Sequence, residues 1–117
     1  MKSIFFHFCL LFLFTVIAKP LAGQKVYRVA YESQADIKVF AEKYESQCDL
    51  KVFFVSYESQ ANKDGLWYWT DYESQADIKI FFVDYESQAD LKIFYVDYES
   101  QAGWRSSEKK HLLHPAH

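Results

Sequence analysis

The sequence predicts a compact all-β protein built from tandem repeats of short strands with a 13-residue period. The phrase Tyr-Glu-Ser-Gln occurs six times, starting at Tyr31, Tyr44, Tyr57, Tyr72, Tyr85 and Tyr98. The successive offsets are 13, 13, 15, 13 and 13 residues, so one repeat carries a two-residue insertion. A fixed short period of this kind indicates tandem structural units.

Each phrase is followed by a short segment typical of a β-strand. Residues 78–83, for example, are Ile-Lys-Ile-Phe-Phe-Val, which is rich in β-branched and aromatic residues and free of Pro and Gly. The apolar residues are contiguous and the run is too short for an amphipathic helix. Alternation places apolar side chains on both faces of the strand, so we expect both faces to be covered. Residues 24–30 are expected to form a leading strand.

Lysine recurs at the same place in four strands, at Lys38, Lys51, Lys79 and Lys92. Strands paired in aligned register would stack these side chains into a column of like charges, which destabilises a sheet. We therefore expect one of two arrangements. Either the ammonium groups reach solvent, or neighbouring strands are offset so that acids such as Asp77 and Asp90 intervene.

The two halves of the repeat vary differently. The strand half exchanges Ile, Leu and Val, and Phe and Tyr, whereas Tyr-Glu-Ser-Gln is identical in all six copies. Duplication alone would have preserved both halves equally. We hypothesise that the polar side chains hydrogen-bond to backbone where strands meet or cross, while the apolar positions need only volume.

Residues 1–23 have the features of a secretory signal peptide. Lys2 provides a positive start, residues 4–18 form an apolar stretch, and Ala18, Ala22 and Gly23 are small residues suited to cleavage after Ala18 or Gly23. The apolar stretch is shorter than the roughly 20 residues of a spanning helix. We expect a secreted or periplasmic protein with no integral membrane span in the mature chain.

The composition of the mature chain limits its partners. Cleavage after Gly23 removes Lys2 and Lys19 and no acid, so the net charge falls from −3 to −5. An acidic protein is a poor ligand for nucleic acid or an anionic membrane surface. Cys48 then remains alone, which rules out an internal disulfide framework and favours a small buried side chain. We expect a monomer without a cofactor.

The third repeat and the C-terminus depart from the pattern. Residues 62–65 are Asn-Lys-Asp-Gly, a strong turn sequence that predicts a hairpin or loop tip. Gly103 and Trp104 end the last repeat. The chain is therefore divided into the signal peptide at 1–23, a β-repeat domain at 24–105 and a mobile polar tail at 106–117.

These motifs resemble a small bacterial family known only as a domain of unknown function. The resemblance covers roughly residues 27–105 and rests on the tandem Tyr-Glu-Ser-Gln-Ala-Asp phrases, the central Asp64-Gly65-Leu66-Trp67 and the closing Ala102-Gly103-Trp104-Arg105. It implies a compact all-β fold whose backbone forms a deep seven-crossing knot, a rare property. This chain departs from the family pattern in its signal peptide and at Ala41-Glu42-Lys43, which suggests a partly exposed first repeat. The resemblance brings no activity or catalytic residue.

Three features of the sequence are candidate sites. Repeated acids lack the Gly-Asp alternation of calcium-binding repeats, so solvated charge is the better interpretation. His111, His114 and His117 have the spacing of a weak metal chelate, but Pro115 interrupts it and no second shell is evident, so we expect no metal site. Trp67 and Trp69 should share one strand face, with Tyr68 on the other. These three residues are the candidate ligand-binding site, with a core role for the Trp pair as the alternative.

The sequence does not name a function. Among the repeats there is no phosphate loop, nucleophile motif or metal-ligand spacing, and a repetitive chain is a poor source of a singular catalytic constellation. We expect an exported, non-enzymatic structural or interaction domain. The alternative is a secreted module that binds glycan or cell-wall fragments through Trp67 and Trp69.

Overall fold

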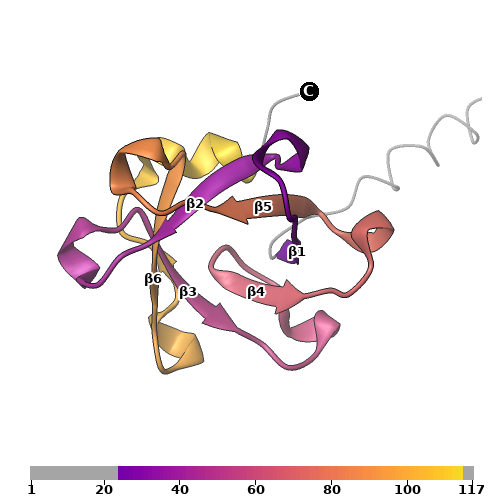
Figure 1. The fold of residues 1–117 in the computed structure, drawn as a ribbon. Helices are drawn as coiled ribbons and strands as arrows, with labels where there is room; N and C mark the ends of the chain where they lie inside the picture. The colour runs from indigo at the N-terminus through magenta and orange to yellow at the C-terminus, as the bar shows by residue number, and fades with distance from the viewer. Residues whose placement is uncertain (1–23, 115–117) are drawn as a thin grey trace, which may run out of the picture.

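The computed structural model describes residues 24–114, so the predicted signal peptide at 1–23 lies outside the described residues. Seven short strands alternate with seven 3-10 helices, and the predicted all-β tandem repeat is confirmed (Figure 1). The strands are β1 (Gln24–Arg28), β2 (Ile37–Ala41), β3 (Leu50–Phe54), β4 (Leu66–Trp69), β5 (Ile78–Phe82), β6 (Leu91–Tyr95) and β7 (Gly103–Trp104). The helices are η1 (Glu32–Gln34), η2 (Glu45–Gln47), η3 (Glu58–Gln60), η4 (Glu73–Gln75), η5 (Glu86–Gln88), η6 (Glu99–Gln101) and η7 (Ser107–Leu112). Within the described range, no helix has the length and hydrophobicity needed to cross a membrane.

Six strands form a closed ring in which all pairs are parallel. The order round the ring is β1-β5-β2-β6-β3-β4, and β4 pairs again with β1. Each of the six strands therefore has a partner on both edges. The β3–β4 seam is the shortest contact, with two residue pairs, Phe53 opposite Leu66 and Phe54 opposite Trp67. β7 pairs antiparallel with Leu50 and Lys51, which precede the residues of β3 that pair with β4.

The chain winds round this ring so that later strands lie between earlier ones. β5 lies between β1 and β2, and β6 lies between β2 and β3. The crossovers, such as residues 29–36 and 42–49, are shorter than the dozen or more residues usual for a parallel connection. Each crossover passes the intervening strand and carries its 3-10 helix on the outside of the ring (Figure 1).

Neighbouring strands are offset by two residues, which separates the lysines. Counting from the Tyr of each repeat, position 9 lies opposite position 7 of the next strand, as in Ile80 opposite Ile37. Lys38 consequently faces Phe81 rather than another lysine. Both features of the two expected arrangements are therefore present: the strands are offset, and the lysine side chains also reach solvent.

The lysine ammonium groups pair with the glutamate of their own repeat. These pairs are Lys38–Glu32 at 3.4 Å, Lys51–Glu45 at 3.7 Å, Lys79–Glu73 at 3.6 Å and Lys92–Glu86 at 3.6 Å. The side chains are substantially solvent-exposed, so each pair contributes at most about 1 kcal/mol. The offset is therefore held by something other than these ion pairs.

The aspartate at position 6 holds the offset by bonding twice to the neighbouring strand. Its carboxylate accepts from a lysine backbone N–H at 2.8–2.9 Å, and its own N–H donates to the carbonyl of that lysine at 2.7–2.8 Å. The four pairs are Asp77 with Lys25, Asp36 with Lys79, Asp90 with Lys38 and Asp49 with Lys92. We call this contact the aspartate clamp. It links β1, β5, β2, β6 and β3 in ring order.

The Tyr-Glu-Ser-Gln phrase has a local role. It forms one 3-10 turn in which the Gln N–H donates to the Tyr carbonyl, and all six Tyr side chains are 64–69% exposed. Gln60 and Gln101 accept from the N–H of Tyr57 and Tyr98 in their own turns. The hypothesis that these side chains bond to backbone where strands meet is therefore wrong. The aspartate that follows them makes that contact.

Positions 7 and 9 point into the ring and form the core. Val39, Leu50, Val52, Ile80 and Ile93 are fully buried in one cluster. A fully buried Val, Leu or Ile side chain contributes about 1.5–3 kcal/mol through the hydrophobic effect. The aromatic residues at position 10 on the outer face are half-buried, as expected for strands that are apolar on both sides.

The inserted turn of the third repeat does not form a hairpin, because β3 and β4 are parallel. Gly65 has φ +95°, and a Cβ there would lie 2.6 Å from the Lys51 carbonyl oxygen and 2.7 Å from the Gly103 nitrogen. Only glycine allows both the positive φ and this close approach. The insertion thus lets three chain segments meet where β3, β4 and β7 converge.

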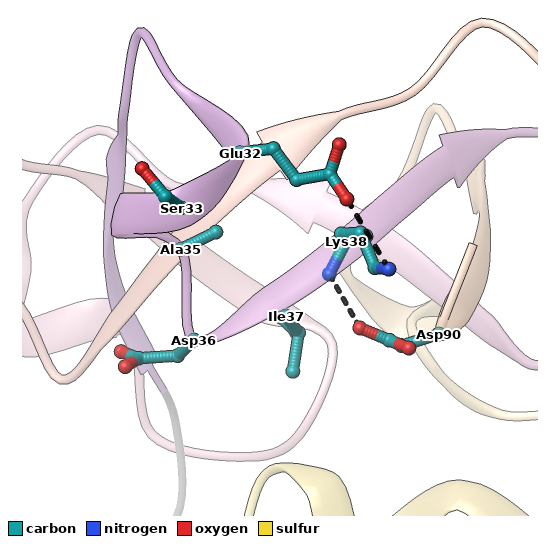
Figure 2. Close-up of a pocket in the computed structure, with 7 residues that line it drawn as sticks. All are labelled: Glu32, Ser33, Ala35, Asp36, Ile37, Lys38 and Asp90. Atoms are coloured by element: carbon teal, nitrogen blue, oxygen red, sulfur yellow. Dashed lines mark hydrogen bonds and ion pairs between the residues drawn. The ribbon is translucent and has the colours of Figure 1, made fainter. Parts of the chain in front are cut away.

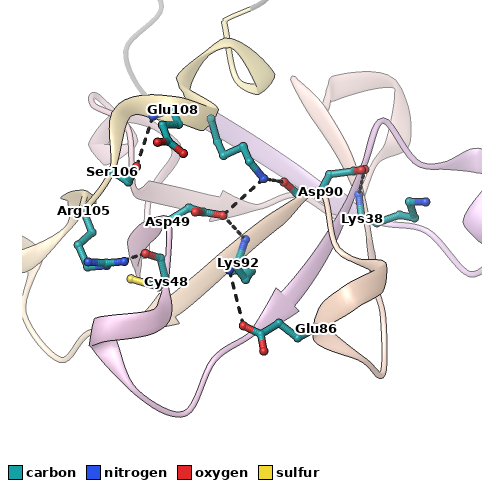
Figure 3. A network of polar contacts seen from close by, with 10 residues as sticks. Lys38, Cys48, Asp49, Glu86, Asp90, Lys92, Arg105, Ser106 and Glu108 are labelled. Atoms are coloured by element: carbon teal, nitrogen blue, oxygen red, sulfur yellow. Dashed lines mark hydrogen bonds and ion pairs between the residues drawn. The ribbon is translucent and has the colours of Figure 1, made fainter.

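The prediction of a mobile polar tail is wrong for residues 106–114. Residues 107–112 form η7, and Leu113 is only 6% exposed within the core cluster. Figure 3 shows one contact that holds this segment, in which Arg105 Nε donates to the Cys48 carbonyl at 2.7 Å. Lys109 Nζ donates to the Asp90 carbonyl at 2.8 Å. Burial of Leu113 and these backbone contacts fix the segment against the ring.

The aspartate clamp predicts that Asp77→Ala lowers the free energy of unfolding by about 1–2 kcal/mol, because the Lys25 N–H loses a charged acceptor. Gln75→Leu should change it by less than about 0.5 kcal/mol, since that side chain is exposed. Urea denaturation of both variants measures the difference. A larger loss for Gln75→Leu would restore the role first assigned to the Tyr-Glu-Ser-Gln phrase.

Candidate functional site

The predicted site residues lie on β4 and have different environments. Trp67 is fully buried, and its Nε1 donates to Gln24 Oε1 at 3.0 Å. Tyr68 packs on the opposite face in a second apolar cluster with Leu66. Trp69 is 38% exposed. The two Trp share a strand face as predicted, but burial leaves Trp67 to the core and only Trp69 on the surface.

Trp69 lies in a group of aromatic side chains at the carboxyl ends of the parallel strands. Its ring stacks on Phe54, with centroids 4.9 Å apart and an interplanar angle of 11°. Phe82 lies 6.4 Å from Trp69, and Tyr95 lies 5.5 Å from Phe54. The Arg28 guanidinium lies 4.8 Å from the Phe82 centroid. We call these five residues the aromatic end face.

The aromatic end face combines apolar area with a positive charge. Tyr95 is 44% exposed and Arg28 is also exposed. Burial raises the pKa of the Tyr95 hydroxyl although Arg28 opposes this, so the hydroxyl is a neutral hydrogen-bonding group at physiological pH. The face can therefore stack against a flat apolar surface and bond to its polar rim.

Four residues of this face were not predicted from the sequence. Arg28, Phe54, Phe82 and Tyr95 all occupy position 11, counted from the Tyr or from its equivalent in the leading strand. Parallel strands bring equivalent positions to the same end of the ring. An alignment of the repeats by position could have grouped them once the strands were known to be parallel.

A second polar cluster surrounds Asp64, in the inserted turn. Its carboxylate accepts from Gln24 Nε2 at 2.9 Å and Trp104 Nε1 at 2.6 Å, and lies 2.6 Å from His114 Nε2. Burial opposes the charge, but the hydrogen bonds outweigh it and hold the pKa of Asp64 below its usual value. Asp64 joins β1, β7 and the C-terminal segment, which favours a structural role.

Glu42 is buried, whereas its neighbours Ala41 and Lys43, in the segment predicted to be partly exposed, are half-buried and exposed, respectively. It occupies position 12, where Val55 and Val96 stand in other repeats, and is only 8% exposed. Its Oε2 is buried without a hydrogen-bond partner. Burial raises the pKa of Glu42, and the neighbouring Glu86 carboxyl raises it further. The first repeat therefore contains a buried acid where others have an apolar side chain.

Other candidate residues have separate environments. Within residues 24–114, no group of three or more His, Cys, Asp or Glu side chains is arranged to hold a metal ion. His111 and His114 lie in this part of the chain, while His117 lies outside the described residues. Cys48 is fully buried, as predicted, and burial raises the pKa of its thiol. A neutral buried thiol is a weak nucleophile.

Comparison with known protein families identifies the family of this chain. A family model of the 7(1) septoil knot domain matches residues 23–105. The chain belongs to this family. No curated protein and no solved structure matched the chain.

The septoil knot domain accounts for the order of strands in the ring. A 7(1) knot is a chain that winds repeatedly round one axis and crosses itself seven times. The interleaving of β5 and β6 between earlier strands is the arrangement that such winding requires. Knots are close to absent among protein folds, and the family match confirms the resemblance from which a knotted fold was expected. The match concerns the fold and carries no assignment to the aromatic end face.

The buried acid predicts that the stability of this septoil knot domain depends on pH. A raised pKa in the folded state means that the protonated form of Glu42 is favoured by folding, so its contribution is present at low pH and is lost as the pH rises through the folded-state pKa. Glu42→Val should raise the free energy of unfolding at pH 7 by about 1–3 kcal/mol. The gain should shrink at pH 4, and denaturation at both pH values measures it.

Glu86→Gln should produce part of the same gain by removing the neighbouring charge. Glu73→Gln is the matched control, because Glu73 forms the equivalent pair with Lys79 at 3.6 Å in another repeat. A gain for Glu42→Val that is identical at pH 4 and pH 7 would show that ionisation of Glu42 has no part in it.

Proposed function

We propose that this chain is an exported, non-enzymatic binding domain in which the closed ring is a rigid scaffold and the aromatic end face binds an extracellular glycan. The observation that carries the proposal is the exposure of Trp69 and Tyr95 beside Arg28. The two exposed rings are in contact with the half-buried rings of Phe54 and Phe82, and contiguous exposed apolar surface of this kind favours a binding site. The export part of the proposal is supported by the signal-like sequence of residues 1–23.

The chemistry of the face suits a sugar ring. Pyranose rings present an apolar C–H surface that stacks on indole and phenol rings, with hydroxyl groups at the rim. The Phe54 ring backs Trp69 at 4.9 Å and limits its rotation, which reduces the entropy lost on binding. The Arg28 guanidinium and the Tyr95 hydroxyl supply hydrogen bonds to the rim. These features favour a glycan over a purely apolar partner.

The ring suits an extracellular scaffold. Exposed strand edges invite association with other chains, and here β4 pairs with both β1 and β3, so the sheet closes on itself. A second candidate function follows from this observation alone: a structural domain valued for resistance to aggregation and proteolysis. It differs from the first in needing no ligand.

Titration with soluble cell-wall fragments and with chitin- and cellulose-derived oligosaccharides, followed by calorimetry, tests the binding function. Trp69→Ala should weaken binding by at least about tenfold, equivalent to about 1.4 kcal/mol, whereas Trp69→Phe should keep part of it. Tyr98→Ala is the matched control, because Tyr98 is 67% exposed on a turn outside the face. If no glycan binds, or if Trp69→Ala and Tyr98→Ala weaken binding equally, the glycan-binding function is contradicted. The structural function is then the remaining candidate.

Export has its own test. Expression of the full sequence followed by cell fractionation and N-terminal sequencing should give an extracytoplasmic protein that begins at Lys19 or Gln24. Cleavage before Gln24 would place the new terminus at the first residue of β1. Recovery of the unprocessed chain in the cytoplasm would contradict export without bearing on glycan binding.

A further inference from the structure

The amino ends of the strands hold a lysine side chain in a defined way. Lys109 Nζ donates to the backbone carbonyl of Asp90 at 2.8 Å and lies 4.0 Å from the Asp49 carboxylate. Asp90 precedes β6 and Asp49 precedes β3, which are neighbours in the ring. The receptor for this ammonium therefore consists of the Asp90 carbonyl at the start of β6 and the clamp carboxylate of Asp49 at the start of β3, its neighbour in the ring (Figure 3).

The internal repeat generates an equivalent receptor one step round the ring. β2 pairs with β6 in the same parallel, two-residue offset as β6 with β3. The Asp90 carboxylate accepts from the Lys38 backbone N–H, just as the Asp49 carboxylate accepts from the Lys92 backbone N–H. The Asp36 carbonyl and the Asp90 carboxylate consequently correspond to the two groups that contact Lys109. Because η7 contacts the ring beside β3 and β6, the receptor between β6 and β2 lies next to it.

A pocket of about 420 Å³ lies at this equivalent position (Figure 2). Its lining includes Glu32, Asp36, Lys38 and Asp90, with the small side chains of Ser33 and Ala35. The Asp36 carboxylate accepts from the Lys79 N–H and points away from Lys38 and Asp90, so Asp36 offers the pocket its backbone carbonyl rather than its charge (Figure 2). The Lys38 ammonium is already paired with Glu32 at 3.4 Å, so the Asp90 carboxylate supplies the remaining negative charge.

We infer that this pocket binds a lysine side chain of a partner protein. The chain's own Lys109 shows which chemistry the repeated receptor accepts: a compact ammonium that can share its three donors between a carbonyl and a carboxylate. The negative lining selects for a cation. The pocket lies at the amino ends of the strands, opposite the aromatic end face, so this inference does not depend on glycan binding.

Nuclear magnetic resonance titration of the ¹⁵N-labelled full chain with the capped tripeptide Gly-Lys-Gly tests the inference. The backbone amides of Ser33, Lys38 and Asp90 should shift saturably, with a dissociation constant on the order of millimolar for so small a probe. The same tripeptide with norleucine in place of lysine keeps the alkyl chain without the charge and should leave these amides unmoved. Equal shifts with both peptides would overturn the inference.

Variants locate the site. Asp90→Asn keeps an oxygen for the Lys38 N–H but removes the charge, and should weaken binding at least about tenfold. Asp77→Asn changes the same clamp position on β5, outside the pocket, and should leave binding unchanged. If Asp90→Asn does not fold, the exposed Glu32→Gln replaces it, with Glu73→Gln as its control and a several-fold loss expected. Full binding by the folded pocket variants would contradict the inference.

Discussion

The two-residue offset between neighbouring strands is the constraint on which the structure depends. Each aspartate clamp bonds one backbone N–H and one carbonyl of the next strand, so it defines both the partner and the register. The offset in turn places each Lys opposite an aromatic residue and sends positions 7 and 9 into one core. A slip by one residue would turn that core outward. At the starts of β2, β3, β5 and β6 the clamp therefore sets the register, as turn geometry does in hairpins.

Strand identity could be predicted from the sequence, but strand order could not. The period and the β-branched residues of segments such as 78–83 sufficed for the former. Nearly identical repeats, however, offer each strand several partners of similar energy, and only the closed ring distinguishes them. Burial also separated Trp67 from Trp69, although both share one face. Leu112 and Leu113 were too few to signal packing amid polar neighbours, yet Leu113 is buried.

Parallel strands give the ring two chemically different ends. Position 11 brings Phe54, Phe82 and Tyr95 together at the carboxyl ends, while position 6 brings four aspartates to the amino ends. An antiparallel sheet would have mixed the two sets. A repeated sequence thus produces polarity along the axis without any difference between its units, and the two proposed binding surfaces follow from that polarity.

The β3–β4 seam has a mechanical consequence. It is held by two residue pairs, whereas the other parallel contacts have three, and it contains no aspartate clamp among the described residues. Thermal breathing of the ring should start there, and the first backbone amide to exchange with solvent in the ring should be one that bridges this seam, such as that of Phe53, which donates to the Gly65 carbonyl at 2.8 Å. The closed sheet should therefore open first at the β3–β4 contact.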